Sequence, residues 1–191
     1  MKIKITTLLA ALILTAALAA NAGETGNAKA GSPEFERMKT LVGSWTGKAD
    51  MGQGPMDMTI QYRLLAGGSV LEERVFAGTP NEMVTMYYDQ DGKLAMTHYC
   101  VFGNRPSMKI KSADAKTIKF DFDATCGINP KKESHMHALS LTFDDADTIT
   151  AKDARNLLRR DAVEGRAEAD FVGIDGCRYR ARWEVRRARL R

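Results

Sequence analysis

The stretch KLAMTHYCVFGNRPSMKIKSADAKTIKFDFD, residues 93–123, decides the fold class because it repeats one pattern three times. In each repeat apolar and polar side chains largely alternate, as they do along a strand whose successive side chains point to opposite faces. The segments GNRP and ADAK separate the repeats and are rich in turn-forming residues. The stretch therefore predicts three consecutive strands joined by tight turns.

Similar segments flank this stretch on both sides. Strand-like patterns cover residues 56–64, 69–77, 82–88, 135–143 and 148–151, and another follows Trp45. About nine short strands without a convincing helix between them predict an all-β protein, either an antiparallel up-and-down barrel or a sandwich. The residues expected to face inward are Met56, Met58, Ile60, Met96, Met108, Ile110, Phe120 and Phe122.

A short helix is expected before the first strand, within SPEFERMKTLVG at residues 32–43. Ser32 fits the N-cap position, Pro33 fits the first helical position, and Gly43 is expected to end the helix. Apolar residues at helical spacing give this segment one face that can be buried. These residues are Phe35, Met38 and Leu41.

The N-terminal segment has the charge, apolar run and small-residue site of a secretory signal peptide. Two lysines precede an uncharged apolar run at residues 5–20, and Ala20-Asn21-Ala22 precedes Gly23. This run is shorter than the roughly 20 apolar residues of a membrane span. We therefore expect cleavage near Ala22 and an exported protein, periplasmic or secreted, whose mature chain has no membrane span. A disordered lead-in is expected at residues 23–31 and the barrel domain at residues 32–150.

The C-terminal segment, residues 151–191, differs from the rest in its basic residues. It contains eleven arginines and one lysine and has a formal charge of +5, whereas residues 1–150 sum to −1. We expect a helix from about Lys152 and then a closing strand over residues 177–186, with arginines along its outer face. Because these arginines lack interleaved aromatic side chains and the protein is expected to be exported, no nucleic-acid partner is expected.

The combination of a short helix, VGSWTG and a series of short strands resembles the lipocalins and lipocalin-like barrels of the calycin type. In that pattern a Gly-x-Trp motif, here Gly43 and Trp45, packs its Trp against the barrel floor near an Arg of the last strand, here Arg186 or Arg187. Residues 35 to about 151 resemble more specifically an uncharacterised bacterial family of exported lipocalin-like proteins. The resemblance implies a calycin-like barrel and no particular activity.

Histidine and cysteine side chains are expected to gather at one mouth of this barrel. His98 and Cys100 lie on the inward face near the end of one strand, and His135 and His137 lie on the inward face at the start of a later strand. In an antiparallel meander these two strand ends meet. Cys126 follows the end of another strand at the same mouth, so Cys100 and Cys126 could form a disulfide.

This polar mouth supports two kinds of site. His98, His135 and His137 could supply three nitrogen ligands to a transition metal such as zinc, with an open position for an activated water. Alternatively, the mouth orients a small, largely apolar molecule held inside the barrel. The residues expected to bind such a ligand are His98, Cys100, Asn104, His135, His137, Met96 and Phe120, and Tyr99 adjoins them although its parity points it outward.

Three functions are therefore open from the sequence. The favoured one is a barrel that binds a small molecule of unknown identity and is not an enzyme. The second is a metal-binding protein or metal-dependent hydrolase that uses the three histidines. The third is a structural or partner-binding domain with a filled core. The sequence does not define an oligomeric state.

Overall fold

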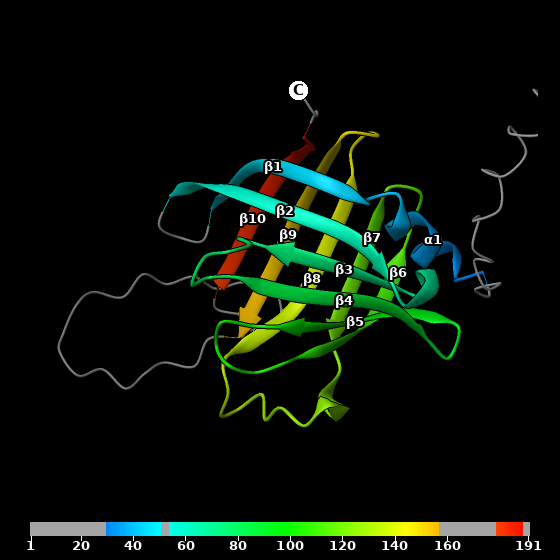
Figure 1. Ribbon diagram of the computed structural model, residues 1–191. Coiled ribbons are helices and arrows are strands. Elements are labelled where there is room, and N and C mark those ends of the chain that lie inside the picture. Colours follow the sequence, from blue (N-terminus) through cyan, green and yellow to red (C-terminus); the bar gives the residue numbers. More distant parts are fainter. Residues whose placement is uncertain (1–29, 51–53, 157–178, 189–191) are drawn as a thin grey trace, which may run out of the picture.

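The protein is a closed barrel of antiparallel strands with a short helix at one end (Figure 1). This computed structural model describes residues 30–50, 54–156 and 179–188. The alternating pattern predicted an all-β up-and-down barrel or a sandwich, and the barrel is confirmed, consistent with the lipocalin-like fold that the family resemblance implies. The expected signal peptide and almost all of the expected lead-in lie outside the described residues.

Within these ranges, ten strands and one α-helix follow one another along the chain. The α-helix and the strands are α1 (Pro33–Lys39), β1 (Gly43–Asp50), β2 (Pro55–Leu65), β3 (Val70–Val75), β4 (Met83–Gln90), β5 (Lys93–Tyr99), β6 (Ser107–Ala113), β7 (Thr117–Phe122), β8 (His135–Phe143), β9 (Thr148–Asn156) and β10 (Tyr179–Arg187). Two single-turn 3-10 helices, Ala66–Gly68 and Ala124–Cys126, lie in the β2–β3 and β7–β8 connections.

Each strand pairs with its neighbours in sequence, and β1 pairs with β10 to close the barrel. In the closing pair, Trp45 lies opposite Arg187 and Ala49 lies opposite Trp183. Closure leaves no exposed sheet edge among the described strands, which removes the usual route to edge-to-edge association. We call the end where β1 begins and β10 ends the floor, and the opposite end, where β5 ends and β8 begins, the mouth.

Helix α1 covers the floor and is built as its sequence predicts. The Ser32 side chain accepts a hydrogen bond from the Phe35 amide at 3.2 Å, and Phe35 and Met38 are buried in the core. The helix ends at Lys39 with Thr40 as its C-cap, so Gly43 does not end it as predicted. Gly43 instead begins β1. Its φ of +130° is a backbone conformation that favours glycine.

The Gly-x-Trp motif closes the floor. Trp45 is 1% exposed and donates its indole N–H to the Leu41 carbonyl at 2.7 Å. Of the two arginines proposed as its partner, Arg187 takes that role: its guanidinium lies 4.6 Å from the Trp45 ring centroid. The same guanidinium donates to the carbonyls of Thr40 and Val42, each at 2.8 Å. One side chain of the last strand thus ties together the helix end and the first strand.

The barrel extends beyond the boundary at residue 150 that composition suggested. β9 continues to Asn156, so the helix expected from Lys152 does not begin there, and β10 is the expected closing strand. Along residues 151–153 burial alternates, with Ala151 and Asp153 buried and Lys152 exposed, which is the period of a strand. The remainder of the expected helix lies outside the described residues.

Most of the predicted inward positions do form the core, but the strand ends differ. Met58, Ile60, Met108 and Phe120 are buried in one hydrophobic cluster. Met56 shares the inward face of β2 but lies at the mouth and is 43% exposed. Within the described residues, no helix is both long and apolar enough to cross a membrane.

The closure of the floor leads to a stability prediction. Replacing Arg187 by Lys keeps the charge but removes the fork that reaches two carbonyls and covers Trp45. Urea unfolding should show a loss of about 1.5–3 kcal/mol, the range for hydrogen bonds made by a charged group. Arg186→Lys is the matched control, because Arg186 points to solvent on the same strand. Equal effects of both substitutions would contradict the role given to Arg187.

Candidate functional site

A small cavity lies inside the barrel, toward the mouth. Its volume is about 20 Å³, which is enough for a water molecule and too little for an organic ligand without movement of the wall. Its wall comes from β2, β3, β4, β5, β8, β9 and β10, and most of it is apolar. The lining residues are Met58, Glu73, Val75, Phe76, Met83, His98, Met136, Leu139, Asp153 and Trp183.

Glu73 carries a carboxylate into this apolar interior. It is 5% exposed and accepts hydrogen bonds from three hydroxyl groups. Tyr62 and Tyr87 donate to Oε2 at 2.6 and 3.1 Å, and Thr85 donates to Oε1 at 3.0 Å. Each donor comes from a strand beside Glu73, since β2 and β4 pair with β3 on either side. The neighbouring strands thus compensate for the burial of the acid.

A chain of hydrogen bonds continues from Glu73 to His98. The Thr85 hydroxyl lies 2.9 Å from His98 Nδ1. When Glu73 is ionised, Thr85 donates its one hydroxyl proton to Glu73, so His98 Nδ1 is the donor in the second contact. The hydrogen bonding therefore places a proton on Nδ1 of His98. Glu73 and His98 both line the cavity, so its wall contains a linked acid and imidazole.

The surroundings of Glu73 change its acidity. Burial raises the pKa of the Glu73 carboxyl above its ordinary value, and the three hydroxyl donors only partly oppose that effect. The pKa values of Tyr62 and Tyr87 are raised well above the ordinary value, first by burial and then by the charge of Glu73. The carboxyl therefore holds its proton to higher pH than an exposed glutamate does.

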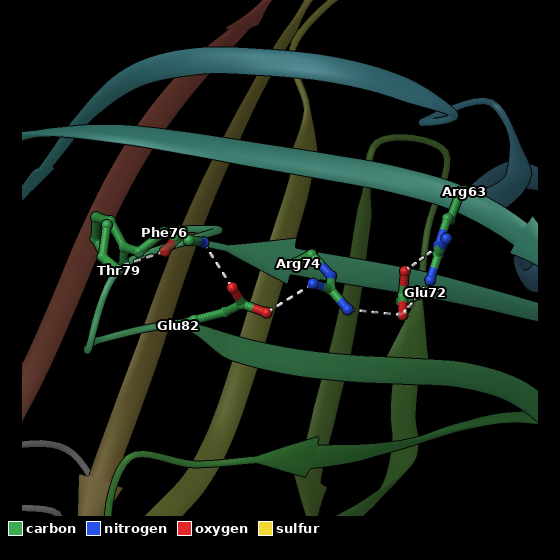
Figure 2. A network of polar contacts seen from close by, with 7 residues as sticks. Arg63, Glu72, Arg74, Phe76, Thr79 and Glu82 are labelled. Atoms are coloured by element: carbon green, nitrogen blue, oxygen red, sulfur yellow. Dashed lines mark hydrogen bonds and ion pairs between the residues drawn. The ribbon is translucent and has the colours of Figure 1, made fainter.

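Glu72, the residue before Glu73, lies on the outer face of the same strand and belongs to an ion-pair network (Figure 2). Arg63 on β2 pairs with Glu72 through two guanidinium nitrogens, and Arg74 lies 3.8 Å from it. Arg74 also pairs with Glu82 at 2.8 Å, and Glu82 accepts from the Gly78 amide at 2.6 Å. The hydrogen bond from Arg63 lowers the pKa of the Glu72 carboxyl.

This network supports the β3–β4 connection, which brings Phe76 to the cavity. Phe76 has φ +55°, an uncommon conformation for a bulky residue. Its amide donates to the Thr59 carbonyl at 3.1 Å, and its own carbonyl accepts from the Thr79 amide and hydroxyl at 3.2 and 2.8 Å, the hydroxyl contact being visible in Figure 2. Such strained conformations cluster at functional sites, where surrounding contacts hold them.

The other two histidines lie apart from the cavity. His135 Nε2 is 3.1 Å from His137 Nδ1, and His135 Nδ1 is 2.8 Å from the Glu133 carbonyl. Both rings contact Phe122, at centroid distances of 4.4 and 5.5 Å. The strand alternation predicted both histidines on the inward face, and a β-bulge between Met136 and Ala138 explains why the structure differs. One extra residue shifts the alternation, so Met136 lines the cavity instead of the two histidines.

The three histidines therefore do not converge as the sequence suggested. His98 belongs to the chain that starts at Glu73, whereas His135 and His137 contact each other and Phe122. Across the described ranges, no three His, Cys, Asp or Glu side chains are grouped so that they could hold a metal ion. The residues that the structure describes thus give no support to the proposed zinc site.

Cys100 and Asn104 lie in the connection after β5 and not inside the barrel. With Glu82, Tyr99 and Arg105 they line an open surface hollow of about 390 Å³. Asn104 donates its side-chain amide to the Ser134 carbonyl at 2.8 Å, which holds two mouth connections together. Tyr99 is 48% exposed.

Cys100 and Cys126 do not form the disulfide considered from the sequence. Two further predicted ligand-binding residues, Met96 and Phe120, are fully buried in the core. Neither lines the cavity, and Phe120 instead packs against Tyr87 at a centroid distance of 6.0 Å. Of the predicted ligand-binding side chains, only His98 reaches the cavity.

Three polar residues of the cavity wall were not among the site residues predicted from the sequence. These are Glu73, Asp153 and Trp183. Strand alternation alone could have placed Glu73 inward, because Leu71 and Val75 flank it at a spacing of two. The same rule places Asp153 beside Ala151. The signal was obscured there because the basic, charged composition after residue 151 suggested a helix.

The fold and this interior define a lipocalin-like antiparallel barrel with a polar group inside an apolar cavity. No protein-family model matches the chain. Over 71 residues it is similar to the SbcC subunit of the nuclease SbcCD from Pseudomonas aeruginosa, at 52% identity, and to the one from Rhodobacter capsulatus, at 54% identity. Each match covers 35% of this chain, and the chain spans only 6% of the length of these relatives. A match of that extent establishes neither a family nor an activity.

The opposite environments of the two glutamates predict opposite pH dependence. Because the folded-state pKa of Glu73 is raised, its titration contributes stability to the folded protein at low pH. This contribution is complete below the unfolded-state pKa, ordinarily 4.5, and is lost as pH rises through the folded-state pKa. Glu73→Gln has no such titration. Its free energy of unfolding relative to wild type should therefore rise as pH increases from about 4.5, as urea unfolding would measure.

Glu72→Gln is the matched control, because the pKa of Glu72 is lowered by Arg63. Its contribution is present above the unfolded-state pKa and is lost as pH falls through the folded-state pKa. This variant should be less stable than wild type at neutral pH and approach it in acid. The same trend with pH in both variants would contradict the assignment of one glutamate inside and one outside.

Proposed function

We propose that this protein binds a small, largely apolar molecule in the cavity at the mouth end of the barrel. The observation that carries the proposal is the buried polar chain of Glu73, Thr85 and His98 at a largely apolar wall, which also contains Asp153. Burying a carboxyl group costs free energy even when it is hydrogen-bonded, and apolar side chains would fill the same space at lower cost. A few convergent polar groups in an apolar cavity are typical of ligand sites.

The cavity must widen to admit such a molecule. Three methionines, Met58, Met83 and Met136, form part of the wall. Methionine has three rotatable bonds and a polarizable sulfur, so it adapts to ligands of irregular shape. Phe76, which is only partly buried and in a strained conformation, forms the outer wall. Movement of these side chains would enlarge the site without breaking strand pairing.

The proposal includes export and a binding role in the periplasm or outside the cell. It rests on the signal-peptide pattern of the N-terminal segment and on the resemblance to exported lipocalin-like proteins. The favoured role is binding and not catalysis.

Toluene binding tests the proposal with a small apolar probe. The purified protein should bind toluene in calorimetric titration, and Leu139→Phe, which fills the cavity from its wall, should weaken that binding at least tenfold. Leu141→Phe is the matched control: Leu141 is equally buried two residues along β8 but does not line the cavity. Both substitutions overpack the core, at a cost of about 1–3 kcal/mol. Absence of toluene binding to wild type, or equal weakening in both variants, would favour the filled-core alternative.

A further inference from the structure

The indole N–H of Trp183 is a buried donor without an assigned acceptor. Trp183 is 7% exposed and lines the cavity, and its Nε1 has no hydrogen-bond partner among the residues that the structure describes. Trp45, by contrast, donates its indole N–H to a carbonyl. Buried donors nearly always have a hydrogen-bond acceptor, because a buried donor without one is removed from water and gains no bond in return. An acceptor that enters the cavity would supply the missing partner.

A buried acceptor lies on the adjacent strand. Asp153 is 2% exposed and also lines the cavity. In the β9–β10 register Trp183 lies opposite Ala151 and Asp153 lies opposite Ala181, so Trp183 and Asp153 are diagonal neighbours on one face. Diagonal neighbours are within reach of long side chains and of a small group between them. The cavity wall therefore offers a donor and an acceptor side by side.

Of the two acids in the wall, Asp153 is the one that lies diagonally beside Trp183. Both oxygens of Glu73 already accept hydrogen bonds from protein hydroxyls. A carboxylate has about four acceptor positions, and the inferred contact uses one of those of Asp153. Asp153 then contacts the ligand directly. Glu73 acts on the ligand only indirectly, through the polarity that it and His98 give to the cavity wall.

We propose that the ligand carries a hydroxyl group that accepts a hydrogen bond from Trp183 Nε1–H and donates one to the Asp153 carboxylate. The inference rests on the proposed function and names the class of ligand: a small apolar alcohol or phenol. A hydroxyl oxygen is both donor and acceptor, whereas a carbonyl only accepts and a methyl group does neither. The apolar part of the molecule packs against the methionines and Leu139.

Phenol, aniline and toluene separate these possibilities because they have the same shape and differ in one group. Phenol should bind wild type about tenfold more tightly than toluene, since one well-made hydrogen bond contributes on that scale. Aniline, whose nitrogen is a good donor and a weak acceptor, should be intermediate. Trp183→Phe removes one of the two hydrogen bonds and Asp153→Asn weakens the other, so in each variant the preference for phenol over toluene should fall. Met136→Leu changes the wall without changing a polar group and should keep the preference.

The two indole N–H signals in an NMR spectrum provide a direct readout in the wild-type chain, which has two tryptophans. Phenol should shift the Trp183 signal downfield, toluene should not, and the Trp45 signal should stay in place as an internal control. The Trp183→Phe variant assigns the signals. If that variant does not fold, Asp153→Asn and the wild-type spectra decide the question.

The failures of the two proposals are distinguishable. If neither toluene nor phenol binds wild type, the cavity is not a ligand site and both proposals fail. If toluene binds as tightly as phenol, or if phenol leaves the Trp183 signal unchanged, the hydroxyl inference is overturned and the apolar cavity remains. Retention of the phenol preference in Trp183→Phe would also overturn the role given to the indole N–H.

Discussion

The contact between Arg187 and Trp45 is the constraint on which the barrel depends. It joins the last strand to the first and fastens both to the end of α1. An up-and-down meander needs such a closure, because its first and last strands are far apart in sequence and otherwise expose unpaired edges. With the floor fixed, each inward position toward the mouth is also fixed, because strand register sets which side chains face the interior.

The interior of the barrel is divided between a packed floor and a polar upper part. Trp45, Phe35 and Met38 fill the floor end, whereas Glu73, His98 and Asp153 line the cavity nearer the mouth. The hydroxyl groups of β2 and β4 that surround Glu73 show how a buried acid is accommodated: Tyr62 and Thr85 lie directly opposite it on the neighbouring strands, and Tyr87 lies diagonally. Glu73 and His98 are thus already held by hydrogen bonds to neighbouring strands, a form of preorganisation that would lower the cost of binding a ligand.

Much of the fold could be predicted from the sequence because strand alternation is a local signal. The helix cap at Ser32 and the strands from residue 56 to 151 follow from local sequence pattern, and the role of the Gly43–Trp45 motif follows from the resemblance to lipocalin-like barrels. The site could be predicted only in part. His98 follows from parity, but the bulge at His137 moves two histidines away from the cavity and brings Met136 into it, and a bulge leaves no clear mark in this sequence. Asp153 and Trp183 become neighbours only through the β9–β10 pairing, which no local pattern specifies.

The most direct test of a ligand-binding barrel is native mass spectrometry of the protein purified without denaturation from its own host. The account predicts a species heavier than the polypeptide by the mass of one small molecule. That mass should be released on unfolding, recovered in an organic extract, and absent from a Leu139→Phe variant prepared in the same way. A spectrum with only the bare polypeptide mass, unchanged between wild type and variant and with nothing in the extract, would contradict the account.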